Sequence, residues 1–202
     1  MRALCLFTLL ALLSPVPQTA PPAASAGADA EGFIRNWLVL APIPIEGDSG
    51  AAEIDRDFLK GEASIRPKPG ETVKVGFDNM TWTAHQASDY FIDFLQAFGR
   101  ARGEYVAAYA VAYIDADAET KATLALSTND QGKAWLNGKQ VFGFGETRTL
   151  EKDTDKVDVT LNKGQNVLVL KVVNEVNNWQ GCARFLKDGA PLTGLRIRNA
   201  PE

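Results

Sequence analysis

Two polar stretches of the sequence combine side chains of the kinds that bind ligands. The first, Asn129-Asp130-Gln131-Gly132, lies between two apolar runs. Carboxylate and amide oxygens in loops are preferred ligands of hard cations such as calcium, and they also bond sugar hydroxyls. Asn and Asp side chains can equally bond neighbouring backbone amides at the corner of a sheet. We interpret the stretch as a sheet corner, with a structural calcium ion or a sugar as the alternative; its spacing is not that of an EF-hand.

The second stretch, residues 174–181, reads NEVNNWQG and surrounds one tryptophan with amides. Sugars bind to proteins by stacking their C–H faces on aromatic rings while nearby amides bond their hydroxyls. Trp179, Asn177, Asn178 and Gln180 are therefore candidate ligand-binding residues. Packing of the Trp179 ring beneath its own loop is the alternative.

Trp82 is a further candidate for ligand binding, because it also lies in polar, turn-rich surroundings. Asp78, Asn79 and His85 are close to it in the sequence and could bond a sugar. Binding through these aromatics requires that Trp82 or Trp179 is exposed to solvent beside amides.

No motif in the sequence indicates catalysis. It contains no G-x-S-x-G, H-E-x-x-H, P-loop or G-x-G-x-x-G pattern. The single histidine, His85, excludes a multi-histidine metal site. We predict that the protein is not an enzyme; a small glycan hydrolase is a weaker alternative that would need two carboxylates converging in a pocket. A net charge of −4 without a block of lysine or arginine argues against nucleic-acid binding.

The N-terminus has the features of a secretory signal peptide. Arg2 precedes an apolar run at 3–13, and Ala24-Ser25-Ala26 forms a small-x-small cleavage site. The run is shorter than the about 20 residues that span a bilayer. We predict a signal peptide at 1–26, a disordered lead-in at 27–32 and a single β-sandwich domain at 33–202. The protein is then secreted or periplasmic without a membrane span. Because Cys5 is removed with the signal peptide, Cys182 has no partner within the chain; we expect a buried thiol, with intermolecular pairing or a reactive thiol as the alternative.

Short strands separated by turns account for most of the remaining sequence. Residues 105–113 alternate between a face with three tyrosines and a face of small residues, which predicts close packing against a second layer. Asn137-Gly138 predicts a type I′ hairpin. Asn166 follows a Lys-Gly turn and is expected to bond the backbone of that turn. We expect Trp37 in the core. Trp135 is expected at one edge of the core, with a ring that presents its flat face outward as the alternative.

Helix is predicted only in short pieces. Residues 46–61 are acidic and rich in glycine and alanine, which predicts a surface loop with one helical turn. Residues 88–98 fit a short helix capped by Ser88 or Asp89, or alternatively a strand followed by a helical turn. The fold class is therefore all-β: an antiparallel β-sandwich with one or two short helical turns.

Two segments carry a resemblance to a known family. STNDQGKAWLNGKQV at 127–141 and VDVTLNKGQNVLVLKVVN at 157–174 resemble a galactose-binding-like jelly roll. They are similar to the sugar-binding domain of family 2 glycoside hydrolases and to related secreted bacterial modules, where an aromatic-x-Asn-Gly turn precedes such a strand. NWLVLAP near the start and NNWQGCARF near the end extend this resemblance over most of the chain.

The resemblance implies a jelly-roll fold and a non-catalytic module that binds a polysaccharide or oligosaccharide. A protein-interaction or assembly domain of the cell envelope is the alternative, because one fold serves many functions. Such an interaction domain predicts a contiguous apolar patch or a symmetric interface. No cofactor is expected beyond the structural calcium ion considered above.

Overall fold

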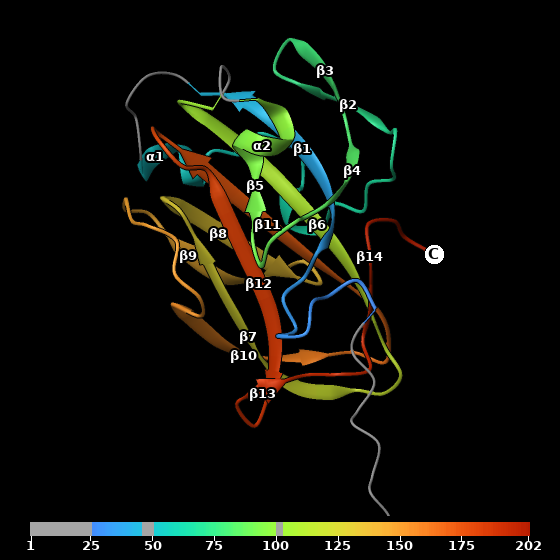
Figure 1. Ribbon diagram of the computed structural model, residues 1–202. Coiled ribbons are helices and arrows are strands. Elements are labelled where there is room, and N and C mark those ends of the chain that lie inside the picture. Colours follow the sequence, from blue (N-terminus) through green and yellow to red (C-terminus); the bar gives the residue numbers. More distant parts are fainter. Residues whose placement is uncertain (1–25, 46–50, 100–102) are drawn as a thin grey trace, which may run out of the picture.

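The computed structural model describes residues 26–45, 51–99 and 103–202. These form two large antiparallel sheets packed face to face and a separate two-stranded sheet (Figure 1). The predicted all-β sandwich is thereby confirmed. The larger sheet has seven strands: β4 (Thr83–Gln86), β1 (Asn36–Pro44), β6 (Val106–Ala116), β11 (Gly164–Asn174), β8 (Gln131–Leu136) and β9 (Lys139–Phe144) in that order, with β14 (Arg196–Arg198) also pairing with β6. The smaller sheet has five: β10 (Asp155–Leu161), β7 (Thr120–Thr128), β12 (Gln180–Lys187) and β13 (Ala190–Pro191), with β5 (Ile92–Asp93) also pairing with β12.

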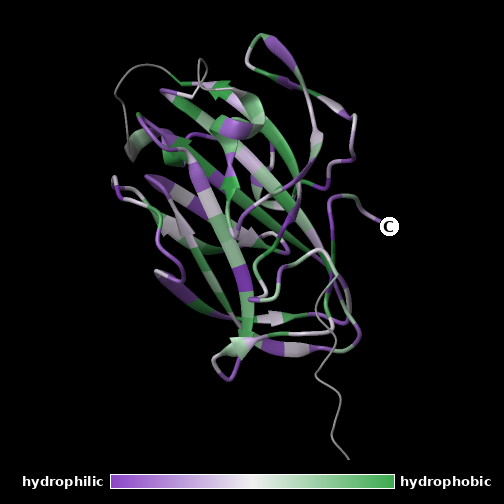
Figure 2. Cartoon of the chain, in the orientation of Figure 1, coloured by the Kyte–Doolittle hydropathy of each residue, from purple (hydrophilic) through white to green (hydrophobic). Residues whose placement is uncertain are grey.

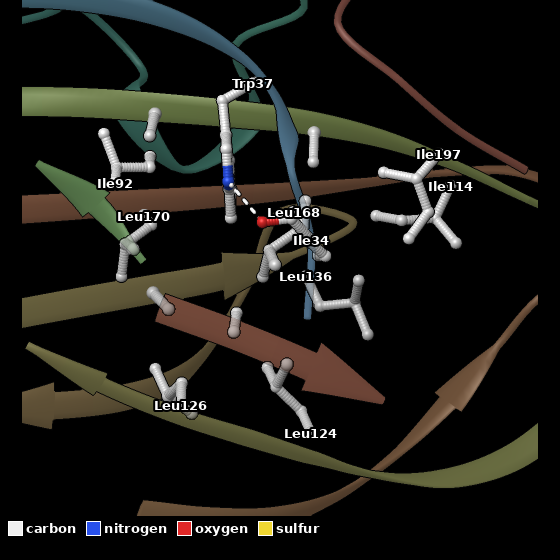
Figure 3. Close-up of a cluster of buried hydrophobic side chains, with 14 of the residues drawn as sticks. Ile34, Trp37, Ile92, Ile114, Leu124, Leu126, Leu136, Leu168, Leu170 and Ile197 are labelled. Atoms are coloured by element: carbon white, nitrogen blue, oxygen red, sulfur yellow. Dashed lines mark hydrogen bonds between the residues drawn. The ribbon is translucent and has the colours of Figure 1, made fainter. Parts of the chain in front are cut away.

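The inner core lies between the two sheets and follows from the alternation along β6. Ala108, Ala110 and Ala112 face inward, and their small side chains leave room for bulky residues of the facing sheet such as Leu124 and Phe185. Figure 3 shows this cluster around Trp37, whose indole Nε1 donates a hydrogen bond to the Ile34 carbonyl at 3.0 Å. The predicted core position of Trp37 is confirmed.

The opposite face of the seven-stranded sheet is also buried. Residues 51–82, which we call the cover segment, lie between β1 and β4 in the sequence and contain α1 (Ala51–Asp55), η1 (Glu62–Ser64), β2 (Thr72–Val75) and β3 (Asp78–Thr81). Ile54, Leu59 and Trp82 of this segment pack against Tyr109 and other side chains on the outer face of the sheet. The central strands are consequently hydrophobic along most of their length (Figure 2).

Trp135 lies in this outer cluster and not at the edge of the inner core, so that expectation is wrong. The alternation along β8 places Trp135 opposite Ala134 and Leu136, as the sequence indicates. The error arises because the cover segment forms a third layer, which makes the outer face of the sheet a second core.

The turns are formed as their residues predict. Asn137 and Gly138 have φ values of 53° and 84° between paired Leu136 and Lys139, which confirms the two-residue hairpin. The Asn166 amide accepts a hydrogen bond from the backbone N–H of Asn162 at 2.8 Å and donates one to the Asn162 carbonyl at 2.8 Å. The predicted structural role of Asn166 is confirmed.

The segment at 88–98 adopts the second of its two predicted forms, a strand followed by a helical turn. β5 is followed by α2 (Phe94–Phe98), and the carboxylate of Asp93 accepts a hydrogen bond from the Gln96 backbone N–H at 3.0 Å. The cap is therefore Asp93, not Ser88 or Asp89.

The N-terminal residues that the structure describes are held to the sandwich. The Ala26 N–H donates to the Leu195 carbonyl at 3.1 Å and the Asp29 N–H to the Phe33 carbonyl at 3.0 Å, which differs from the disordered lead-in expected at 27–32. The predicted signal peptide lies almost entirely outside the described residues. Within the described part of the chain, no helix is long and apolar enough to cross a membrane.

Candidate functional site

Trp179 is buried, contrary to the exposure that stacking on a sugar requires. Its side chain is 0% exposed, its indole Nε1 donates to the Val172 carbonyl at 3.4 Å, and its ring centroid lies 4.9 Å from that of Phe94. Packing of Trp179 beneath the loop, the alternative interpretation, is what the structure shows. Asn177 and Asn178 are exposed above it, so the loop presents amides without an aromatic platform.

Trp82 is buried as well, at 2% exposure, and the expectation that it is exposed is wrong. Its backbone N–H donates to the Glu71 carbonyl at 2.9 Å, and its ring belongs to the outer core under the cover segment. Trp179 belongs to the inner core, so the seven-stranded sheet separates the two tryptophans. The predicted ligand residues do not form one site.

The remaining predicted residues are dispersed in the same way. Gln180 is half-buried and pairs with Asp93 at the edge between β12 and β5. Asp78 and Asn79 are exposed in the β2–β3 hairpin, and His85 lies in β4, where burial lowers the pKa of its imidazole.

An open groove of about 830 Å³ lies between the two sheets in the described part of the chain. It lies where edge strand β9 of one sheet approaches edge strand β10 of the other. Aliphatic side chains from five strands line it: Ala122, Leu136, Val141, Val159 and Leu186. A volume of this size is typical of ligand sites, which combine an apolar lining with a few polar groups.

Polar side chains also line this inter-sheet groove. They are Lys121, Thr123, Asn137, Lys139, Asp158, Thr160, Asn162, Lys187 and Asp188. The Thr123 hydroxyl donates to Asp158 Oδ1 at 3.1 Å, and both amide groups of the Asn137–Asn166 pair are used within the fold. Among the described residues, Lys121, Lys139 and Lys187 form no ion pair with a carboxylate, so their ammonium groups are available to a ligand.

The groove can bind a ligand, but its two carboxylates do not have the surroundings of a general acid. Asp158 and Asp188 are both exposed. A carboxyl group that donates a proton at neutral pH is normally removed from water, as in glycoside hydrolases. The arrangement therefore favours recognition over hydrolysis.

The sequence gives little sign of this groove, because its residues come from four separate segments. Val157 and Val159 alternate with charged residues in β10, which predicts a half-buried strand but not the neighbour of its edge. The proximity of β9 and β10 depends on how the two sheets are stacked, which local patterns do not specify.

The corner at residues 129–132 is held by contacts with a distant segment. The Asn129 side chain Nδ2 and the Asp130 backbone N–H both donate to the Arg148 carbonyl, at 2.8 and 3.0 Å. The Arg148 guanidinium in turn donates to the Thr128 carbonyl at 3.1 Å and to Asp155 Oδ2 at 2.5 Å. The predicted sheet corner is confirmed, although its bonds run to distant segments, namely the chain between β9 and β10, Glu175 and Gln180, and not to adjacent amides.

Comparison with known proteins gives no match to a family model and no match to a curated protein.

Proposed function

We propose that the protein is a non-catalytic carbohydrate-binding module that holds its ligand in the inter-sheet groove. The observation that carries this proposal is the groove itself, with an aliphatic floor beside exposed amide, hydroxyl, carboxylate and ammonium groups. A sugar ring offers C–H faces to such a floor and hydroxyls to such polar groups. The resemblance to galactose-binding-like modules supports the same function.

A glycan in the inter-sheet groove would be bound without the aromatic stacking expected from the sequence. The buried rings of Trp82 and Trp179 are not available for stacking, and the groove residues include no aromatic side chain. Aliphatic contacts with Val141 and Val159 would take the place of stacking, and hydrogen bonds would contribute a larger share of specificity.

The test is calorimetric titration of the protein with soluble polysaccharides and oligosaccharides. Asn162→Ala and Lys187→Ala remove exposed side chains at the groove, and we expect each to weaken binding about 5- to 20-fold, equivalent to about 1–2 kcal/mol for a lost hydrogen bond to a ligand. Asn178→Ala is the matched control, because it removes an exposed amide from the Trp179 loop.

Equal loss in the Asn178→Ala variant would move the site to the Trp179 loop. Absence of binding to every glycan would overturn the proposed function.

The fully exposed ring of Phe77 favours a second candidate function, protein interaction. Phe77 and Val176 are the exposed large hydrophobic residues in the described part of the chain, and Phe77 lies at the tip of the β2–β3 hairpin, which projects from the sandwich (Figure 1). Phenylalanine is enriched at protein–protein interfaces, so the Phe77 ring is suited to insert into a partner pocket even though it does not form a contiguous apolar patch. Cross-linking of envelope proteins to the wild-type chain, but not to Phe77→Ala, would support this function.

A further inference from the structure

Five residues with oxygen-bearing side chains gather at the start of β8 and the end of β11. The register Gln131↔Val173 brings Gln131, with Asp130 before it, to the end of β11, where Asn174 and Glu175 follow Val173, and the Asn129 N–H donates to the Gln180 carbonyl of β12 at 2.9 Å. Gln131 Nε2 donates to Glu175 Oε1 at 2.6 Å, and the Glu175 backbone N–H lies 3.4 Å from Asp130 Oδ2. Leu136, which lines the groove, is at the opposite end of β8, so this cluster is separate from the proposed glycan site.

Three of the five residues bury an oxygen that has no hydrogen-bond donor. Asn129 is 7% exposed, Gln131 1% and Asn174 0%, and the side-chain oxygen of each lacks a partner among the described residues. Buried polar atoms are normally paired, and unpaired ones are costly. All three unpaired atoms are acceptors, so a cation would satisfy each of them whereas another carbonyl would not.

The cluster also contains two carboxylates without a cation of their own. The ion pairs of the described residues include neither Asp130 nor Glu175. Two basic side chains of neighbouring segments are engaged with other carboxylates: Arg148 pairs with Asp155, and Lys133 pairs with Asp55 at 2.5 Å. A bound positive charge would relieve the repulsion between Asp130 and Glu175.

We propose that these residues bind one calcium ion, through the carboxylates of Asp130 and Glu175 and the amide oxygens of Asn129, Gln131 and Asn174. Calcium accepts six to eight oxygen ligands in flexible geometry, and water or backbone carbonyls would complete the set. The donor set contains neither imidazole nor thiolate, which favours calcium over zinc or copper.

Gln131 would take part by rotating its amide. In the present arrangement its Nε2 faces Glu175 and its Oε1 is unpaired. A half-turn about the last side-chain bond brings the oxygen toward the two carboxylates, where a cation between them would attract it.

The test is titration of the chelator-treated full chain with calcium chloride by calorimetry, with thermal unfolding measured in calcium and in chelator. We expect one site per chain and a higher melting temperature in calcium, because a ligand that binds only the folded state stabilises it. Magnesium should bind more weakly, since it demands a smaller octahedral site. Asp130→Asn and, separately, Glu175→Gln should each weaken calcium binding about 10-fold or more.

Asp158→Asn is the matched control, since it removes a carboxylate at the groove and should leave calcium affinity unchanged. If Asp130→Asn does not fold, Glu175→Gln decides the matter, because Glu175 is only half-buried. Absence of calcium binding to the wild-type chain would overturn the proposal, and so would binding that both cluster variants retain. Neither result depends on whether a glycan binds.

Discussion

Replacing Lys171 with methionine should destabilise the protein strongly, because this lysine holds the cover segment on the sheet. Its side chain is fully buried on the outer face of β11. The Nζ atom donates to the carbonyls of Ile54 and Arg56 at 3.0 and 2.6 Å and lies 3.5 Å from Glu62 Oε2. Glu62 also accepts a hydrogen bond from the Tyr109 hydroxyl.

The magnitude follows from what the substitution leaves behind. Burial raises the pKa of Glu62 and lowers that of Lys171, so each charge depends on the other for compensation. Removing one partner of a buried ion pair costs about 3–5 kcal/mol. For a domain of this size that lowers the melting temperature by roughly 6–20 °C.

Thermal and urea unfolding measure this cost, and a second variant separates charge from packing. Lys171→Met with Glu62→Gln removes both charges while the glutamine can still accept from Tyr109, so the double variant should recover most of the loss. Lys152→Met is the control: its ion pair with Glu31 is exposed to solvent, so its loss should change stability little. A loss below 1 kcal/mol in Lys171→Met would refute the role of this lysine.

Three further predictions concern buried groups elsewhere. Burial raises the pKa of the Cys182 thiol to about 12, so at pH 8 its thiolate fraction should be about 1,000-fold lower than that of an ordinary cysteine. Peptide mass spectrometry should therefore show alkylation of Cys182 only after unfolding. Rapid labelling of the folded protein would contradict this prediction. Burial raises the pKa of Tyr113 to about 12, above its value in the unfolded chain, so unfolding releases protons at alkaline pH. The melting temperature should therefore fall as pH rises from about 10 to 12, and it should fall less in Tyr113→Phe. Identical alkaline melting curves for the two proteins would count against this prediction. In Gly132→Ala the new Cβ would lie 2.5 Å from Thr128 Oγ1, which should lower the free energy of unfolding measured in urea by about 1–3 kcal/mol. The control Gly143→Ala, at an exposed position, should change this free energy little. Equal effects of the two substitutions would show that Thr128 can move aside.

Local patterns were sufficient to predict the two faces of β6, the hairpin turn and the core position of Trp37. The alternation along residues 105–113 gave the two faces of β6, and Asn137-Gly138 gave the hairpin, because both depend on residues adjacent in sequence. The position of Trp37 followed in the same way from its apolar neighbours.

The cover segment and the candidate sites could not be predicted in this way, because they depend on contacts between distant residues. The contact between Lys171 and Ile54 joins residues 117 positions apart, and nothing near Ile54 in the sequence indicates that a lysine lies above it. The polar sequence around Trp179 correctly indicated an exposed loop, but an indole can turn beneath such a loop when an apolar partner such as Phe94 lies there. Even at the corner, where the residues were identified, their partner Arg148 was not.

The position of the cover segment between paired strands β1 and β4 has a consequence for any outside partner. Those strands pair directly, so the segment is an excursion that leaves the sheet, lies on its outer face and returns. Because the cover segment is covalently attached at both ends, its binding to the outer face is intramolecular. Its effective concentration at that face is about millimolar or higher. A partner that binds the outer face would have to displace the cover segment at this high effective concentration. Partners are therefore expected to bind at the edges and ends of the sandwich.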